Sequence, residues 1–262
     1  MNISEIYIYP IKSLGGIRLN SSPTEPTGLL YDRRWMLTDT SGNFLSQRKF
    51  PQMSLLKVSI VEDNLLVYHK NIPEQKLNIP IAQDLNKNKL VKVWADNLPA
   101  LLVSPNADAW FSEMLGIDCL LVKLNPKYKR MVKKKYRQNS EQVSFADSMP
   151  YLIIGQSSLD ELNSRLTQKV PILRFRPNLV FTGGKPFEED DWQQIKIGSQ
   201  EFKITKPCAR CIITTINLDN GKKGKEPLYT LSKYHNKNGK ILIGQNMLSL
   251  QKVLVAKKSQ RG

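Results

Sequence analysis

Cysteine and histidine are scarce in this sequence: its 262 residues include three cysteines and two histidines. Three cysteines do not make a disulfide framework, and an odd number of them suits a reducing compartment. With two histidines, no Ser-His-Asp triad is evident. We therefore expect neither a disulfide-stapled fold nor a triad hydrolase.

Long apolar runs are also missing. Nowhere do about 18 apolar residues follow one another, so no transmembrane helix is expected. The first eight residues carry no basic segment and no long apolar core, so no signal peptide is predicted. We expect a soluble, cytoplasmic protein. Its 40% apolar content is ample for a packed core, in one large or two modest domains.

Basic residues outnumber acidic ones, 39 Lys and Arg against 23 Asp and Glu, which gives a net charge of +16. This imbalance predicts attraction to an anion: a nucleic acid, an anionic lipid, a phosphorylated ligand or an acidic protein. The alternative is a lysine-rich surface that serves solubility alone. The two interpretations differ in whether the charge gathers at one place.

The positive charge is densest between Lys127 and Arg137. This cationic segment holds Lys127, Lys129, Arg130, Lys133, Lys134, Lys135 and Arg137, with Tyr128 and Tyr136 among them. Such a run is usually a solvated, mobile loop, and the alternative is a docking site for an acidic partner. Nucleic-acid binding is the weakest of the three interpretations, because no recognised nucleic-acid motif accompanies the run.

Short stretches of alternating apolar residues, separated by Gly, Pro and Asn, predict many short strands. The expected strands are 3–8, 35–38 with 44–45 as a hairpin, 55–61 with 64–68 as a second hairpin, 91–94, 101–103, 178–181, 195–197, 201–205, 211–216 and 248–256. The fold class predicted is therefore mainly β with a few helices, built from β-barrels.

Two segments have helical periodicity. Residues 106–117 repeat apolar side chains every three or four positions, and Gly116 is a plausible C-cap. Residues 157–166 begin with a serine pair, and Glu161 follows Ser158 at the spacing of a capping box. A domain boundary is expected near residue 120, which divides the chain into 1–120 and 121–262.

Cys208 and Cys211 form a C-x-x-C unit that three chemistries could use. Zinc needs four ligands, and the remaining Cys119, His69 and His235 lack paired spacing. A redox dithiol normally opens a helix, whereas the β-branched residues after Cys211 predict a strand.

The third chemistry is one thiolate bound to a soft metal, which the nearby positive charges of Lys206 and Arg210 favour. The alternative is that the two cysteines bind no metal and are a half-buried structural pair on a barrel strand. Spacing alone does not choose between these two.

Six motifs in order along the chain resemble the molybdenum cofactor sulfurase C-terminal (MOSC) domain family. The similarity is to the branch that contains the mitochondrial amidoxime-reducing component and its bacterial relatives. The motifs are Tyr9-Pro10-Ile11-Lys12-Ser13, Asp32-Arg33-Arg34-Trp35, Asp147-Ser148-Met149-Pro150, Phe175-Arg176-Pro177-Asn178, the block from Cys208 to Thr215 with Asp219-Asn220-Gly221 and Glu226-Pro227-Leu228, and Gly244-Gln245-Asn246. They span nearly the whole chain, and together they are specific although each alone is weak.

The resemblance implies a MOSC N-terminal β-barrel-like domain in 1–120 and a MOSC β-barrel, which binds the molybdenum cofactor (molybdenum-molybdopterin), in 121–262. By position, Cys211 takes the role of metal ligand and catalytic residue. The cofactor-binding residues implied are Lys12, Ser13, Arg33, Ser148, Met149, Arg176, Arg210, Cys211 and Asn246. Met149 stands where a hydroxyl side chain is expected, and Ser148 is the candidate to replace it.

The activity implied is a molybdenum-dependent oxidoreductase, independent of pyridoxal phosphate, that reduces N–OH or N-oxide groups of small substrates to amines or amidines. The chain lacks ferredoxin-type cysteines and a membrane anchor, so a separate acidic donor, flavodoxin-like or ferredoxin-like, is expected to supply electrons and to dock at the cationic segment. The alternatives are a persulfide carrier and a non-catalytic protein that binds the cofactor.

Overall fold

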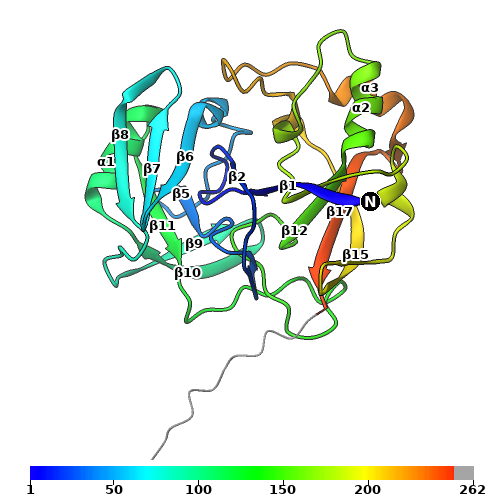
Figure 1. Cartoon of the computed structure of the whole chain (residues 1–262). Helices are drawn as coiled ribbons and strands as arrows, with labels where there is room; N and C mark the ends of the chain where they lie inside the picture. The colour runs from blue at the N-terminus through cyan, green and yellow to red at the C-terminus, as the bar shows by residue number, and fades with distance from the viewer. Residues whose placement is uncertain (251–262) are drawn as a thin grey trace, which may run out of the picture.

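Strands predominate over helices in the computed structural model, which describes residues 1–250 (Figure 1). The first half holds β2 (Ile17–Leu19), β3 (Thr24–Glu25), β4 (Gly28–Leu29), β5 (Trp35–Asp39), β6 (Leu56–Val61), β7 (Asn64–His69), β8 (Ile72–Pro80), β9 (Asn88–Val93), β10 (Asp96–Leu102) and β11 (Cys119–Leu124), with the 3-10 helix η1 (Pro51–Leu55) and helix α1 (Pro105–Leu115). Strands β6, β7 and β8 form one sheet, and β5, β11, β10 and β9 form another. Both pack, with α1, around a core that includes Trp35, Leu65, Phe111 and Leu121.

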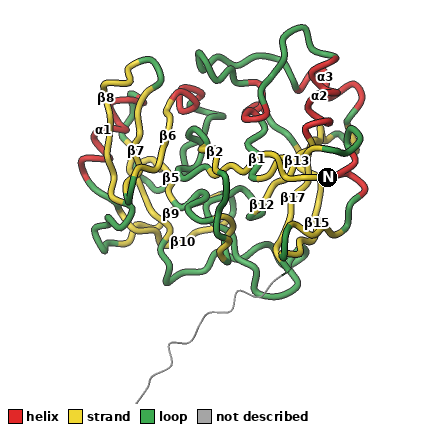
Figure 2. The backbone as a smooth tube through the Cα atoms, viewed as in Figure 1, coloured by secondary structure: helices red, strands yellow, loops and turns green. Residues whose placement is uncertain are grey.

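The second half is built on one curled sheet in the order β14-β15-β17-β12-β13-β1-β2 (Figure 2). Its strands are β1 (Asn2–Ile8), β12 (Tyr151–Gly155), β13 (Leu179–Thr182), β14 (Gln194–Ile197), β15 (Gln200–Ala209), β16 (Asn236–Lys237, paired with β17) and β17 (Lys240–Ser249). Helices α2 (Gln156–Ser164) and α3 (Leu228–Tyr234) and the 3-10 helices η2 (Ile172–Arg174), η3 (Glu188–Asp191) and η4 (Ile212–Thr215) complete it. The mainly β fold predicted from the sequence is confirmed.

The N-terminal strand β1 joins the sheet of the second half, where it pairs with β13 and β2. Strand β11 spans residue 120 and pairs with β5 and β10 of the first half. The predicted boundary near residue 120 therefore falls inside a strand, and its position stays a prediction. None of the helices within residues 1–250 is long and apolar enough to cross a membrane.

Helix α1 confirms the helix predicted for this region, and local sequence explains it. The Ser104 hydroxyl accepts a hydrogen bond from the Ala107 N–H at 3.1 Å, and Pro105 occupies the first turn. Gly116 ends the helix in the left-handed conformation, as expected of a C-cap. Ala107, Phe111 and Leu115 face the core at four-residue spacing.

Helix α2 is present, but the capping box predicted for it is wrong. Its N-cap is Gly155 without a side-chain cap, and Ser158 is buried. Ser158 Oγ donates to Glu189 Oε2 at 2.8 Å, while Glu189 Oε1 accepts from the Gly155 N–H at 3.0 Å. A carboxylate from η3 thus satisfies the helix start that Glu161 was expected to satisfy.

The strand predicted at 211–216 is also wrong: residues Ile212–Thr215 form the 3-10 helix η4. The Thr214 and Thr215 hydroxyls donate to the carbonyls of Cys211 and Ile212 at 3.0 and 2.8 Å. These local bonds compete with strand pairing and stabilise a tight turn instead. The last strand starts at Lys240 rather than at 248, and residues 251–256 of the predicted strand lie outside the described residues.

His235 ties η3, α3 and β17 together. Its Nε2 lies 3.0 Å from Asp190 Oδ2, its Nδ1 lies 2.7 Å from the Leu242 carbonyl oxygen, and its ring stacks on Phe187. Both nitrogens therefore face acceptors, which suits the imidazolium. The hydrogen bond to Asp190 raises the pKa of His235 above its ordinary value of 6.5, although burial opposes the shift.

We expect this contact to stabilise the protein at low rather than high pH. A raised pKa in the folded state gives stability that is complete below about pH 6.5 and is lost as the pH rises through the raised pKa. In urea unfolding, the free energy of unfolding of the wild type should be lower at about pH 9 than at about pH 6. The same decrease should be smaller in His235→Gln. Equal falls in the two proteins would show that His235 is neutral in the fold.

Candidate functional site

A cavity of about 590 Å³ opens between the two halves of the chain. Its walls come from the turn after β1, the loop before β12, the loop before β13, the end of β15 with η4, and the β16–β17 hairpin. The nine residues that the sequence nominated all line it: Lys12, Ser13, Arg33, Ser148, Met149, Arg176, Arg210, Cys211 and Asn246. The fold brings them together, and the role of each in binding stays a prediction.

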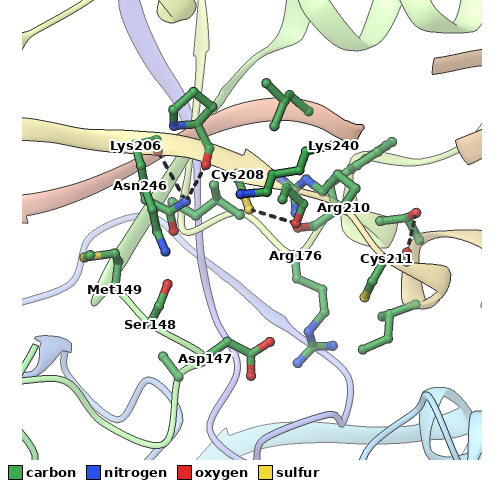
Figure 3. Close-up of a pocket in the computed structure, with 18 of the residues that line it drawn as sticks. Asp147, Ser148, Met149, Arg176, Lys206, Cys208, Arg210, Cys211, Lys240 and Asn246 are labelled. Atoms are coloured by element: carbon green, nitrogen blue, oxygen red, sulfur yellow. Dashed lines mark hydrogen bonds between the residues drawn. The ribbon is translucent and has the colours of Figure 1, made fainter. Parts of the chain in front are cut away.

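Cys211 lies just beyond β15, as the N-cap of η4, with an extended backbone. Its side chain is half-buried, and its Sγ has no hydrogen-bond partner among residues 1–250. Figure 3 shows Cys211 and Arg176 extending into the same space as Asp147. Cys208 packs against the apolar cluster that includes Tyr9 and Phe175. Of the two thiols, Cys211 has the fewer constraints from the protein.

Positive charge dominates the cavity wall. Among the described residues, cationic side chains come from Lys12, Arg33, Arg48, Arg174, Arg176, Lys206, Arg210, Lys237 and Lys240, and the one carboxylate is Asp147. Nine cations against one carboxylate create a potential that attracts an anion. Part of the excess charge seen in the composition is thus concentrated at this cavity.

Arg176 has a buried N–H group that no atom of residues 1–250 accepts. Its guanidinium lies 4.2 Å from the Tyr9 ring, and Arg33 lies 4.5 Å from the same ring. Arg176 Nη1 donates to the Leu14 carbonyl at 2.6 Å, but Nη2 is buried without a partner among these residues. Burial, and after it the charge of Arg33, lower the pKa of Arg176 to about 10. A buried guanidinium N–H with no acceptor indicates a ligand oxygen.

Arg33, by contrast, has its charge compensated by the protein. It donates to Asp32 at 2.6 Å, to the Asn178 side-chain oxygen at 3.2 Å and to the Arg176 carbonyl at 3.2 Å. Burial lowers the pKa of Arg33, but the charges of Asp32, Tyr9 and Asp147 and the hydrogen bond to Asp32 together outweigh it, and the pKa is raised. Arg33 therefore serves first to hold the loop that carries Arg176.

Four of the cavity residues have left-handed backbones although none is glycine. Ser13, Arg33, Arg176 and Asn238 have φ of 70°, 50°, 55° and 52°. Each such residue costs on the order of 1 kcal/mol, and such residues gather at functional sites where the surrounding structure holds them. Here the hydrogen bonds of Arg33 and Arg176 hold the loops that face the cavity.

Lys12 is buried, 5% exposed, and pairs with Asp147. Its ammonium also donates to the Phe145 carbonyl at 2.8 Å. Burial lowers the pKa of Lys12, and Asp147 opposes this. Asp147 in turn accepts from Trp94 Nε1 at 3.1 Å and from Arg48 at 3.3 Å. Loss of water raises the pKa of Asp147, but Lys12 and Arg48 outweigh it and hold the pKa well below its usual range.

Arg210 and Asn246 hold the cysteine loop. The Arg210 guanidinium donates to the Ile243 carbonyl at 2.7 and 2.9 Å and to the Phe175 carbonyl at 2.8 Å. The Asn246 amide nitrogen lies 3.4 Å from the carbonyls of Lys206 and Pro207. These contacts make both residues positioning groups for the segment 206–211.

Met149 is buried in a small apolar cluster with Val132, Val143 and Leu248. Its neighbour Ser148 is half-buried and lines the cavity. A hydroxyl one residue before position 149 thus lines the cavity, and its role in binding stays a prediction.

Several cavity residues were not nominated as site residues from the sequence. They are Arg48, Tyr136, Asp147, Arg174, Lys206, Cys208, Lys237 and Lys240, among others that line the wall. Arg174 lies two residues before Arg176 and could have been nominated with its motif. Lys237 and Lys240 belong to a hairpin with no motif, so only their placement in space identifies them.

The cationic segment is not uniformly a solvated loop. Arg130 is buried, and it donates to Asp96 at 2.8 Å and to the carbonyls of Ser144 and Ala146. Tyr136 lines the cavity, with Lys206 4.7 Å from its ring. The exposed members are Lys127, Lys129, Lys133, Lys134 and Lys135. The fully exposed positive charge of the cationic segment is therefore carried by lysines.

A β-rich fold whose cation-lined cavity presents the half-buried Cys211 thiol defines a class of proteins suited to an anionic ligand with a soft centre. The chain matches the MOSC N-terminal beta barrel domain over residues 1–118 and the MOSC domain over residues 140–258. It belongs to the MOSC-domain family.

Several relatives of known type are similar over most of the chain. Mitochondrial amidoxime-reducing component 1 of Mus musculus is 32% identical over 246 residues, which is 88% of this chain and 71% of that protein. Mitochondrial amidoxime reducing component 2 of Bos taurus is 33% identical over 243 residues, with the same coverage. The molybdenum cofactor sulfurase of Oryza sativa subsp. japonica is 32% identical over 93% of this chain, but the chain spans about a third (32%) of that protein's length.

Proposed function

We propose that the cavity binds the molybdenum cofactor, that the Cys211 thiolate ligates its metal, and that the protein reduces small N-hydroxylated compounds to amines or amidines. Membership of the MOSC family and the similarity to amidoxime-reducing components and molybdenum cofactor sulfurases support this. The observation that carries the proposal is the pairing of a free Cys211 thiol with the buried, unpartnered Nη2 of Arg176 in one cation-lined cavity.

The donor set fits such a cofactor. A thiolate is a soft ligand and suits a metal that is also held by sulfur. A phosphate needs arginine, lysine and hydroxyl donors, which Arg176, Lys206, Ser13 and Ser148 would supply. When bound, the cofactor supplies the two-electron redox chemistry at an N–O bond, which no protein side chain provides.

The chain's own residues bind and orient. Arg210 and Asn246 fix the loop of Cys211, and the Arg33–Tyr9–Arg176 stack fixes the anion-binding guanidinium. Lys12 and Asp147 hold the two halves of the cavity wall together. The overall reaction consumes two electrons and two protons for each N–OH group and releases the amidine and water.

The test is made with protein expressed in a host that makes the cofactor. Reduced methyl viologen serves as donor and benzamidoxime as substrate, and the expected result is molybdenum-dependent formation of benzamidine. Bound molybdenum without turnover would indicate a non-catalytic cofactor-binding protein. Metal-free protein with sulfur released by cyanide would indicate a persulfide carrier, with Cys211 or Cys208 holding the sulfur.

Electrons are proposed to come from a separate acidic redox protein, flavodoxin-like or ferredoxin-like, that docks on the exposed lysines of the cationic segment. Changing Lys133, Lys134 and Lys135 together to glutamate should lower turnover with a flavodoxin about tenfold at low salt, because lost attraction slows association. Turnover with reduced methyl viologen serves as the control and should not change.

Raising the ionic strength should narrow the gap between wild type and variant, since salt screens exposed charges over about 10 Å. If turnover with the protein donor were the same in both proteins and at both salt concentrations, the cationic segment would have no docking role.

A further inference from the structure

A second cavity, of about 790 Å³, lies where β6 meets the loops 165–174 and 217–230. It combines the first half of the chain, through Lys57, with the second half, through the two loops. Its charged lining consists of Lys57, Arg165, Lys169, Arg174, Asp219 and Glu226. None of these residues except Arg174 lines the cavity of Cys211.

The two carboxylates of this cavity are already engaged. Asp219 pairs with Lys70, and Glu226 accepts a hydrogen bond from the Thr230 N–H at 3.0 Å. Arg165 is engaged too, since its Nε donates to Glu161 at 2.7 Å. Three cations that line this cavity make no ion pair and no side-chain hydrogen bond with any of residues 1–250. They are Lys57, Lys169 and Arg174.

Lys57 is half-buried in a positive surrounding. Burial, and after it the charge of Lys70, lower the pKa of Lys57, while the charge of Asp219 acts in the opposite direction. The loss of water and the like charge both disfavour the ammonium, so an anion placed here would be bound favourably.

Arg174 borders both cavities, at the end of η2. Its guanidinium makes no side-chain hydrogen bond within the described part of the chain, and its Nε is buried without a partner. Burial lowers the pKa of Arg174. A planar guanidinium with free donors is the group best suited to grip a carboxylate or a phosphate.

The two cavities adjoin at Arg174, which lines both. Ser13 lines the first and Lys57 lines the second, and their neighbours Gly15 and Leu56 are joined by a hydrogen bond from the Gly15 N–H to the Leu56 carbonyl at 3.0 Å. A methyl group on Gly15 would lie 3.3 Å from Lys57 Cα, so glycine permits the close approach. One ligand that passes Arg174 could therefore occupy both cavities.

We propose that Lys57, Lys169 and Arg174 form an oxyanion subsite that binds a carboxylate or phosphate group of the substrate while its N–OH end occupies the cavity of Cys211. The substrate part of this inference rests on the proposed reductase function. Physiological substrates are then N-hydroxylated compounds that carry an acidic group, and neutral ones are poorer.

The test uses cofactor-loaded protein, so that the first cavity is filled. The two test variants are Lys57→Gln and Lys169→Gln, and the control is Lys76→Gln, at an exposed lysine on β8. Benzoate and phenyl phosphate are titrated into 15N-labelled protein. We expect shifts at the amides of Thr167, Gln168 and Leu218, which line the second cavity. The two cavity variants should bind about tenfold more weakly, and Lys76→Gln should bind as the wild type does. The stronger of the two probes shows whether the subsite prefers a carboxylate or a phosphate.

A kinetic measurement completes the test. The KM of benzamidoximes that carry a carboxylate on alkyl chains of increasing length should rise about tenfold in Lys57→Gln, with kcat retained and with plain benzamidoxime unaffected. Anion binding without any N-hydroxyl reduction would leave the subsite standing and remove the reductase. Reduction of benzamidoxime with no anion shifts and no preference for the acidic series would overturn the subsite and leave the reductase.

Discussion

Cys211→Ala is expected to remove bound molybdenum and to lower benzamidoxime turnover by at least about a thousandfold, since the metal loses its protein ligand. Cys208→Ala should keep its molybdenum and retain turnover within about threefold. The two thiols are three residues apart and both line the cavity, so they form a matched pair. The difference arises because Cys208 packs against apolar side chains, whereas Cys211 has no partner among residues 1–250.

Stability measurements separate loss of the ligand from loss of the fold. The half-buried Cys211 side chain makes no hydrogen bond within the described residues, so Cys211→Ala should change the unfolding free energy of cofactor-free protein by less than about 1 kcal/mol. Cys208→Ala should cost about 1 kcal/mol through lost packing. If the two variants lost molybdenum equally, the assignment of Cys211 as the ligand would be wrong.

Arg176→Gln is expected to weaken cofactor retention by about 30- to 100-fold, which corresponds to about 2–3 kcal/mol for charge-assisted hydrogen bonds to a phosphate. The reason is the free Nη2 of Arg176, buried and without an acceptor in the cavity. The substitution also removes a like charge next to Arg33. Cofactor release is followed by the molybdenum that remains after repeated desalting.

Cofactor-free Arg176→Gln should unfold within about 1 kcal/mol of the wild type, because relief of the repulsion with Arg33 offsets the lost hydrogen bond to Leu14. Arg18→Gln, at an exposed arginine on β2, serves as the control and should retain the cofactor fully. Full retention in Arg176→Gln would show that the unpartnered guanidinium is not an anion ligand.

Local periodicity predicted much of the fold. Helix α1 has its apolar repeat, its C-cap glycine and its end within a few residues of the prediction. The hairpin of β6 and β7 and the buried strand β13 also match, because their alternation or apolar character is expressed within six residues. Such elements are stabilised mainly by residues a few positions apart in the chain, so their pattern can be recognised in the local sequence.

Elements that depend on distant partners were missed or misassigned. The carboxylate at the start of helix α2 comes from Glu189, which lies 31 residues after Ser158 in the sequence. The capping-box spacing of Ser158 and Glu161 therefore has no structural role. The β-branched residues after Cys211 form η4 and not the predicted strand, because the hydroxyls of Thr214 and Thr215 donate to backbone carbonyls. The first part of β17 was overlooked because its pairing with β12 and β15 is not visible in its own sequence.

Nine residues of the cavity could be predicted from motifs, but the hydrogen-bonding state of each cation among them could not. Arg33, Arg176 and Arg210 all come from motifs, yet Arg33 is paired, Arg210 donates to carbonyls and Arg176 has a free buried N–H. Which guanidinium is free depends on where carbonyl oxygens lie in space. The sequence shows where the positive charges are, but only the fold shows whether each one already has a hydrogen-bond acceptor or an ion-pair partner within the protein.

The most direct test of the central claim is X-ray absorption at the molybdenum edge, on wild type and Cys211→Ala prepared in a host that makes the cofactor. The account predicts about one molybdenum per chain in the wild type, with one more sulfur neighbour than in whatever metal the variant retains. Wild-type protein that binds no molybdenum in that host, or a metal with the same sulfur neighbours in both proteins, would contradict it.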